Sequence, residues 1–337
     1  MDISQPQHAT QAGVFSFAGM PEDVVDLSMH AGVLYVAGSD ELIRMIDIGD
    51  AEDPTLIGSL DVGDPILAME LEGGHVFVGC AHAGLQIFDV SSPAQPVLVG
   101  EFRGDEGEAR VPALDARNGL VGVAIEGVGI HLLDVQVPSS PVFLSRTGLR
   151  RDVLDITLGD GDAYYCKIVG STGAFPDTKL YRFDIQDTSS PSIVEQVRFD
   201  SFYATEAVEF ELQGRYGYLR DGDRGIMIFD LEDEDDPLRH VGTYRGEGIY
   251  GRGRYSVTGD SLVYSGRFLE VLDIRDGIGC STCLSDFDGD TDVDAADVHA
   301  YIEAHADHEV YADLNFDGEW DYFDVRVYIE TVRDGCP

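Results

Sequence analysis

The chain has 337 residues, of which 44% are hydrophobic and 9% aromatic, so it is long enough for about two domains with buried cores. It carries 63 acidic and 22 basic residues, a formal net charge of −41 at pH 7. A charge of that size repels phosphate backbones and anionic lipid headgroups, which excludes nucleic acid and acidic membrane surfaces as expected partners.

Membrane and targeting segments are not apparent. No apolar run reaches the roughly 20 residues that a transmembrane helix requires, so no membrane span is expected. The first residues, MDISQPQHATQ, have neither the basic n-region nor the apolar h-region of a signal peptide. The cysteines and family resemblances described below nonetheless favour an extracellular or cell-surface location, with any leader missing from this chain.

A repeat organises the first part of the chain. Six apolar segments each end in an apolar-Asp-apolar step, and their aspartates are spaced by 42, 45, 50, 46 and 43 residues. These aspartates are Asp47, Asp89, Asp134, Asp184, Asp230 and Asp273. Each repeat contains four short alternating runs divided by Gly, Asp and Pro turns, as in ILAMELEGG, HVFVGC, LQIFDV and VLVGEF. The spacing therefore indicates one four-stranded unit per repeat.

Such units cannot bury their faces alone, so six of them predict a six-bladed β-propeller over residues 11–277, with an open β-solenoid as the alternative. The sixth repeat stops after FLEVLDIRDG, without a fourth strand. The segment from Gln11 to Gly19, QAGVFSFAG, resembles the fourth strands of other repeats. We therefore expect this N-terminal strand to complete the sixth blade and to close the ring.

The second repeat carries a family resemblance. Its core, GLQIFDVSSPAQP at residues 84–96, resembles the LVIVD-type propeller repeats of bacterial and archaeal surface or secreted proteins. The resemblance covers roughly residues 11–277. It implies a mainly β propeller and an extracellular setting, and it implies no common activity. The fourth repeat departs from the pattern through an insertion at residues 168–178.

The predicted innermost strands suggest a candidate ligand site. Their alignment puts six residues at one equivalent position, namely Asp26, Ala68, Ala113, Asp155, Glu209 and Arg254. The charged members would line a propeller channel and suit a cation or a polar ligand, such as an extracellular glycan or polymer. The alternative is an ordinary water-filled channel with paired charges. His82 lies in a loop on the face of the predicted propeller where this ligand site would open. It is interpreted either as a site residue or as a solvated loop residue.

Sequence motifs for catalysis are absent. The chain has no Gly-x-Ser-x-Gly elbow, no His-Glu-x-x-His motif and no Walker loop, and its only lysines are Lys167 and Lys179. No catalytic residue is therefore assigned, and a non-enzymatic protein is favoured. The alternatives are a secreted hydrolase or lyase acting on polysaccharide and a purely structural cell-surface protein.

Residues 280–337 contain 16 acids and two arginines, and they predict a small helical calcium-binding domain. Two twelve-residue segments, DFDGDTDVDAAD and DLNFDGEWDYFD, place oxygen donors where a calcium loop requires them. The first site is Asp286, Asp288, Asp290, Asp292 through its carbonyl, Asp294 and Asp297. The second is Asp313, Asn315, Asp317, Glu319 through its carbonyl, Asp321 and Asp324. Two Ca²⁺ ions are the expected cofactors.

Each loop runs into an amphipathic helix, AADVHAYIEAHA or YFDVRVYIETV, and apolar residues recur in both at matching positions. This duplicated loop–helix unit resembles a type I dockerin domain over about residues 285–333. The resemblance implies docking onto a cohesin-like protein partner through loop positions 10 and 11, which are Ala295, Ala296, Tyr322 and Phe323. The alternative is an acidic, disordered tail.

The five cysteines divide in the same way. Cys80 and Cys166 lie in second strands of separate repeats and are interpreted as buried thiols. Cys280, Cys283 and Cys336 flank the calcium loops, where a disulfide from Cys336 to Cys283 or Cys280 would clasp the domain and indicate an oxidising compartment. A zinc site built from these three cysteines and a histidine is the alternative.

These features predict a secreted, non-enzymatic binding or scaffold protein. A six-bladed propeller over residues 11–277 would act as the recognition module. A calcium-dependent, dockerin-like module over residues 280–337 would tether it to a protein partner.

Overall fold

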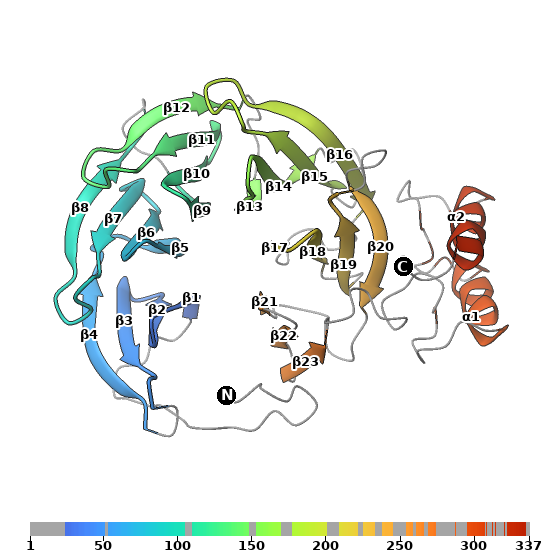
Figure 1. The fold of residues 1–337 in the computed structure, drawn as a ribbon, viewed down its shortest axis with the longest axis horizontal. Coiled ribbons are helices and arrows are strands. Elements are labelled where there is room, and N and C mark those ends of the chain that lie inside the picture. Colours follow the sequence, from blue (N-terminus) through green and yellow to red (C-terminus); the bar gives the residue numbers. More distant parts are fainter. Residues whose placement is uncertain are drawn as a thin grey trace. The chain divides into compact units, whose positions relative to one another are not determined.

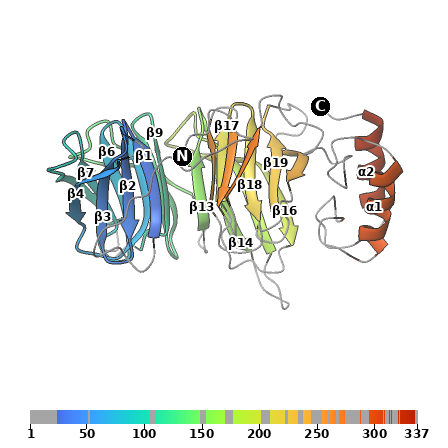
Figure 2. The same ribbon diagram turned by 90° about the horizontal axis from the view of Figure 1, so that it is seen from below.

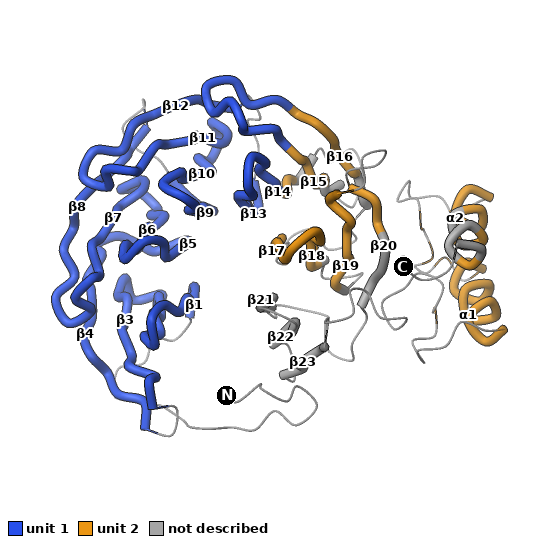
Figure 3. The backbone as a smooth tube through the Cα atoms, viewed as in Figure 1, with its two compact units in different colours: residues 1–165, 183–192 blue, residues 166–182, 193–337 orange. Residues whose placement is uncertain are grey.

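The computed structural model describes residues 24–50, 53–104, 110–147, 153–169, 177–200, 209–221, 225–232, 238–244, 254–258, 261–265, 269–273, 287, 295–306, 308, 312, 314, 320 and 322–334. The chain divides into two compact units (Figure 3). Unit 1 contains residues 1–165 and 183–192, and unit 2 contains residues 166–182 and 193–337.

The described strands form five four-stranded sheets and one three-stranded sheet, numbered 1 to 6 here in chain order (Figure 1). Sheet 1 contains β1 (Val24–His30), β2 (Val33–Gly38), β3 (Leu42–Asp47) and β4 (Thr55–Asp61). Sheet 2 contains β5 (Ile66–Glu72), β6 (His75–Cys80), β7 (Leu85–Asp89) and β8 (Val97–Phe102). Sheet 3 contains β9 (Ala113–Arg117), β10 (Leu120–Ile125), β11 (Gly129–Asp134) and β12 (Val142–Arg146).

The later strands follow the same order. Sheet 4 contains β13 (Val153–Leu158), β14 (Asp162–Val169), β15 (Asp177–Asp184) and β16 (Ser192–Asp200). Sheet 5 contains β17 (Glu209–Gln213), β18 (Tyr216–Asp221), β19 (Gly225–Asp230) and β20 (Arg239–Tyr244). Sheet 6 contains β21 (Arg254–Thr258), β22 (Ser261–Ser265) and β23 (Leu269–Asp273). The mainly β fold is thereby confirmed, with four strands in each of sheets 1 to 5. The predicted closing strand, residues 11–19, lies outside the described residues.

Two-residue turns join the first and second strands of sheets 1, 2 and 3. In each turn both residues have positive φ, and the pairs are Ala31–Gly32, Gly73–Gly74 and Asn118–Gly119. Two consecutive positive φ values define a type I′ turn, whose twist matches that of the flanking antiparallel strands. The turns explain why Gly recurs at this point of the repeat.

The repeated aspartates end the third strands. The Asp47 carboxylate accepts a hydrogen bond from the Gly49 backbone N–H at 2.8 Å, and Asp89 accepts one from Ser91 at 2.8 Å. Asp134, Asp184 and Asp230 make the same bond to the residue two positions later. This Asx turn redirects the chain into the Ser/Pro segment that leads to the fourth strand. Five of the six conspicuous aspartates of the repeat are therefore turn formers.

The Ser/Pro segments also join neighbouring sheets. A Cβ placed on Gly100 of β8 would lie 2.0 Å from the Pro138 carbonyl oxygen of the next repeat, so only glycine fits there. At the equivalent point of β12, the Ser145 hydroxyl donates a hydrogen bond of 2.5 Å to the Thr188 carbonyl. β8 and β12 thus each receive a turn from the following repeat, β8 by close approach and β12 by a hydrogen bond.

The core of unit 1 lies between sheets. Tyr35, Ile43 and Met45 of sheet 1 pack with Val78 and Phe88 of sheet 2. The opposite face of sheet 2 packs against sheet 3 through a second cluster that includes Phe77, Leu85, Ile87, Val121, Val123 and Leu133. Because a middle sheet is covered on both faces, its strands are apolar at nearly every position, as in the HVFVGC run of β6.

The C-terminal helices are α1 (Ala295–Ala306) and α2 (Tyr322–Asp334) (Figure 2). Both begin where the sequence predicts them. The rings of Tyr301 and Tyr328 stack between the helices at 4.1 Å with an interplanar angle of 11°. Phe287 packs edge-on against both tyrosines, at 5.2 and 5.9 Å between ring centroids. The matching positions of the two loop–helix halves therefore share one small aromatic core.

Candidate functional site

A carboxylate on the first strand of one sheet holds the first strand of the next. The Asp26 carboxylate on β1 accepts one hydrogen bond from the Leu27 backbone N–H at 2.8 Å and another from the Met69 N–H of β5 at 3.0 Å. Asp115 on β9 repeats the arrangement, accepting from Ala116 at 2.7 Å and from Leu158 of β13 at 2.6 Å. Both acids therefore join sheets, and Asp26 has this role at a position predicted to line a channel.

Asp115 was not among the predicted site residues. It lies two positions along β9 from Ala113, the residue that the alignment put at the position equivalent to Asp26. An alignment restricted to that one position therefore misses Asp115. Burial raises the pKa of Asp115, although the hydrogen bonds from Leu158 and Ala116 act in the opposite direction. A further bond, from the Asn118 N–H to Glu72 at 2.5 Å, joins sheet 3 to sheet 2 near the same turns.

The other predicted channel residues have different surroundings. Glu209 on β17 forms an ion pair of 3.4 Å with Arg220 of β18, whose side chain is fully buried. Asp155 lies on β13 and is partly buried and engaged in polar interactions. Arg254 begins β21, and its side chain lies outside the description. Asp26 and Asp155 belong to unit 1, whereas Glu209 and Arg254 belong to unit 2.

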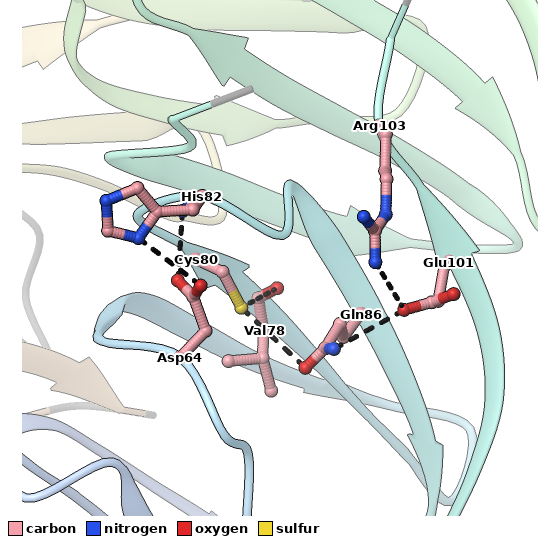
Figure 4. A network of polar contacts seen from close by, with 7 residues as sticks. All are labelled: Asp64, Val78, Cys80, His82, Gln86, Glu101 and Arg103. Atoms are coloured by element: carbon pink, nitrogen blue, oxygen red, sulfur yellow. Dashed lines mark hydrogen bonds and ion pairs between the residues drawn. The ribbon is translucent and has the colours of Figure 1, made fainter. Parts of the chain in front are cut away.

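Two pairs of polar side chains lie at loops that connect second and third strands. His82 follows β6, where its backbone N–H donates to Asp64 at 2.9 Å and its Nδ1 lies 3.3 Å from the same carboxylate (Figure 4). Glu126 follows β10, and its carboxylate lies 2.8 Å from Arg110 Nε. Each pair ties its loop to the segment that leads into the sheet. His82 is thus an exposed loop residue held by a neighbouring acid.

The thiol of Cys80 lies beneath the first of these pairs (Figure 4). Its single S–H donor has two acceptors within weak hydrogen-bond range, the Val78 carbonyl at 3.7 Å and Gln86 Oε1 at 3.8 Å. Burial, and then the charges of Asp64 and Glu101, raise the pKa of Cys80 to about 12. A thiol that stays protonated is a poor nucleophile and a poor metal ligand. The prediction that Cys80 and Cys166 are buried thiols is confirmed.

The last acid of each predicted calcium loop has the same environment. Asp297 and Asp324 are 1% and 0% exposed, at the starts of α1 and α2. Asp297 accepts a hydrogen bond from the Phe287 backbone N–H at 2.7 Å, and Asp324 accepts one from the Leu314 N–H at 2.8 Å. Each bond joins loop position 12 to loop position 2. Positions 2 and 12 are therefore joined by the same hydrogen bond in both halves.

The remaining predicted calcium ligands lie outside the described residues: Asp286, Asp288, Asp290, Asp292, Asp294, Asp313, Asn315, Asp317, Glu319 and Asp321. So do Cys280, Cys283 and Cys336. Within the part of the chain that is described, no three histidine, cysteine or acidic side chains form a metal-binding group. The two position-12 carboxylates nonetheless fit a hard cation, because carboxylate oxygen is the donor that calcium prefers.

The predicted partner-contact residues are exposed. Tyr322 and Phe323, at the start of α2, are 70% and 54% exposed, and Ala295 and Ala296 are exposed at the start of α1. Further along the helices, four more apolar side chains are exposed, namely Val298, Ile302, Ile329 and Val332. Neither helix among the described residues is long and apolar enough to cross a membrane.

The fold defines a class of protein first: a repeat protein built from four-stranded antiparallel sheets. Within that class, the LVIVD repeat family matches residues 69–103, which run from β5 to the end of β8. No curated protein matches the chain.

Solved structures with a similar fold are numerous, with 870 matching chains. The crystal structure of the computationally designed Ika8 protein has 13% sequence identity and a TM-score of 0.53, covering 76% of this chain and 73% of that one. The computationally designed Ika4 protein has 15% identity and a TM-score of 0.39, covering 49% of this chain and 94% of that one. At 13% identity, the match to Ika8 shows likeness of fold alone, and fold does not imply function.

Proposed function

We propose that the protein is a secreted, non-enzymatic binding or scaffold protein, in which a β-repeat recognition body carries a calcium-organised docking module. The observation that carries the proposal is the matched pair of buried acids Asp297 and Asp324, each bonded to position 2 of its own loop. A buried carboxylate is costly unless hydrogen bonds and positive charge compensate it. Calcium would supply that charge.

The six acids or amides of each predicted loop would hold one ion. In the first loop Asp297 would close the coordination begun by Asp286, and in the second Asp324 would close that begun by Asp313. When bound, calcium supplies positive charge at the base of each helix. The chain contributes the hydrogen bonds from Phe287 and Leu314, which orient each closing carboxylate before an ion arrives.

The apolar start of α2 supports a docking role for the module. Tyr322 and Phe323 are large and exposed, whereas the matching residues of α1, Ala295 and Ala296, are small. Exposed aromatic residues of this kind are typical of a protein-binding surface. We infer that a cohesin-like partner binds chiefly through the second half, because the two halves offer different side chains.

The six-bladed, closed form of the β-repeat body belongs to the same proposal. Leu27 and Met29 of β1 are 56% and 65% exposed, while Met69 and Leu114, which take the place of Leu27 in β5 and β9, are 4% and 8% exposed. The face of β1 thus has the apolar character of a packed sheet face. A sixth blade, completed by residues 11–19, would cover it and remove the open edge of a linear array.

Calcium titration of the full chain tests the docking module. Added calcium should give a saturable heat of binding and raise the unfolding temperature, since a ligand that binds only the folded state stabilises it. The double variant Asp297→Asn with Asp324→Asn should lose both effects. Glu303→Gln, which removes an exposed acid of α1, should keep them. Absence of any calcium response in the wild type would contradict the proposal.

Binding to an isolated type I cohesin module tests the docking surface separately. The wild type should bind with calcium and lose binding with a chelator. Phe323→Ala should weaken binding by roughly tenfold or more, as expected for an exposed aromatic anchor, and Ile302→Ala on α1 should change it little. If calcium stabilises the chain and no cohesin module binds, the docking partner is wrong while the calcium site stands.

A further inference from the structure

The junction between sheets 2 and 3 closes tightly at a glycine. Gly79 of β6 pairs with Ala68 of β5, and a Cβ placed on Gly79 would lie 2.6 Å from the Val111 carbonyl oxygen. The bare glycine lets the segment before β9 approach, so that the Val111 N–H donates to the Cys80 carbonyl at 3.0 Å. The Val111 side chain is fully buried as a result.

The next junction, between sheet 3 and β13, has alanine at the same place. Ala124 of β10 pairs with Ala113 of β9, as Gly79 pairs with Ala68. Ala124 therefore carries a methyl group at the position where Gly79 has none. The Ile125 carbonyl accepts a hydrogen bond from the Val128 N–H of its own loop, at 3.0 Å.

A cavity of about 160 Å³ remains at this second junction. Its lining residues include Arg110, Pro112, Ala124, Ile125, Glu126 and Val153. Proline, alanine, isoleucine and valine make an apolar floor, while Arg110 and Glu126 supply opposite charges 2.8 Å apart. Both charged side chains are about half exposed, so they are accessible to a ligand from solvent.

The charges restrict the chemistry that the cavity can accept. A guanidinium binds a carboxylate through paired hydrogen bonds, and a carboxylate binds an ammonium group. The chain carries a net charge of −41, which repels an approaching anion at long range. A zwitterion has no net charge and is not repelled. A cavity of about 150 Å³ admits a molecule of the size of benzene, which is enough for an aliphatic side chain.

We propose that this cavity binds an aliphatic amino acid of about the size of valine, either free or at the end of a peptide. The ligand carboxylate lies against Arg110, its ammonium group against Glu126, and its side chain on Ile125 and Val153. The proposal rests on the recognition role of the β-repeat body and names a ligand class for it. Sheets 2 and 3 cannot offer the same site, because Val111 fills their junction.

Calorimetric titration of the calcium-loaded full chain with L-valine tests the proposal. We expect a saturable heat, and binding at least tenfold weaker for valinamide and for N-acetylvaline, each of which lacks one charge. The dipeptides Val-Gly and Gly-Val distinguish the sources. Binding of Val-Gly as tight as that of valine assigns the site to a peptide N-terminus, and the same result for Gly-Val assigns it to a C-terminus.

Variants locate the site. Arg110→Gln and Glu126→Gln should each weaken valine binding roughly tenfold or more. Arg103→Gln, which removes a similarly exposed arginine paired with Glu101 at 3.4 Å, should leave it unchanged. The proposal would be overturned if the wild type gave no saturable heat with valine. It would also be overturned if Arg103→Gln weakened valine binding as much as Arg110→Gln. The calcium response of the same sample shows whether the docking module fails with it.

Discussion

Two neighbouring sheet junctions of unit 1 differ at one small residue and in how closely they are packed. At the junction of sheets 2 and 3, Gly79 allows Val111 to hydrogen bond to Cys80 and to fill the space between the sheets. At the junction of sheet 3 with β13, Ala124 takes that place and a cavity of about 160 Å³ remains. The repeat therefore preserves strands and turns, while small side chains between sheets decide where a ligand can enter.

The largest expected effect comes from giving the closed junction the side chain of the open one. Gly79→Ala would place a Cβ 2.6 Å from a backbone oxygen and 2.9 Å from Val111 Cγ1. Because backbone cannot move aside cheaply, we expect the free energy of unfolding to fall by about 3 kcal/mol, near the upper end for overpacking. Urea unfolding followed by near-UV circular dichroism measures it.

The reverse change is the control. Ala124→Gly should cost no more than about 1 kcal/mol, since it adds only chain flexibility and removes one methyl group. Equal losses from the two substitutions would mean that the glycine and the alanine do not distinguish the junctions.

The carboxylates that join first strands come next. Asp115→Ala leaves the N–H groups of Leu158 and Ala116 without their acceptor, and Leu158 is buried. We expect a loss of about 2 kcal/mol in unfolding free energy, the cost of unsatisfied buried donors. Asp26→Ala should behave similarly at the junction of sheets 1 and 2. In Asp115→Ala, amide hydrogen exchange should become faster than in the wild type at Leu158 and stay unchanged at Met69, which would localise the effect. Unchanged exchange at both amides would contradict the prediction.

The pH dependence of Asp115 sharpens the same comparison. Burial raises its pKa above the ordinary 3.8, so the folded state holds the proton more tightly than the unfolded chain. Its contribution to the free energy of unfolding is therefore greatest below 3.8 and falls as the pH rises through the folded pKa. Urea midpoints measured across this range should show that fall in the wild type and lose it in Asp115→Asn.

Asp40 provides a contrast of opposite sign. The hydrogen bond from Arg44 lowers the pKa of Asp40, so its contribution to stability is present above the ordinary value and is lost as the pH falls. Asp40→Asn should therefore remove the part of the stability loss at low pH that comes from protonation of Asp40. If both variants changed the slope in the same direction, the buried setting of Asp115 would be refuted.

The smallest effect is expected at the rim of the open junction. Arg110→Gln breaks an ion pair in which both side chains are about half exposed, and such pairs contribute between about 0 and 1 kcal/mol. The unfolding temperature should hardly change, although valine binding should weaken. A large loss of stability would instead assign the pair a structural role equivalent to that of Val111.

Local chemistry made much of the fold predictable. The strands of sheets 1 to 3, the four strands of each repeat and the beginnings of α1 and α2 follow from apolar periodicity and from turn residues. Asp89 ends β7 because its carboxylate bonds a backbone N–H two residues later. Asn118–Gly119 turns the chain because both residues tolerate positive φ. Such contacts join residues within a few positions of each other, so the order of the sequence already contains them.

Contacts between repeats could not be predicted in this way. Asp26 looked like a channel residue in the alignment, yet its second oxygen is committed to Met69, 43 residues away. Asp115, Arg220 and the cavity beside Ala124 had no signal in any motif. Their roles depend on which backbone approaches from the neighbouring sheet. A Cβ added to Gly79 would lie 2.6 Å from the Val111 carbonyl oxygen, and this close approach exists only once the two sheets have packed. The repeat specified the sheets, and packing between them decided which carboxylates became structural and where a cavity was left.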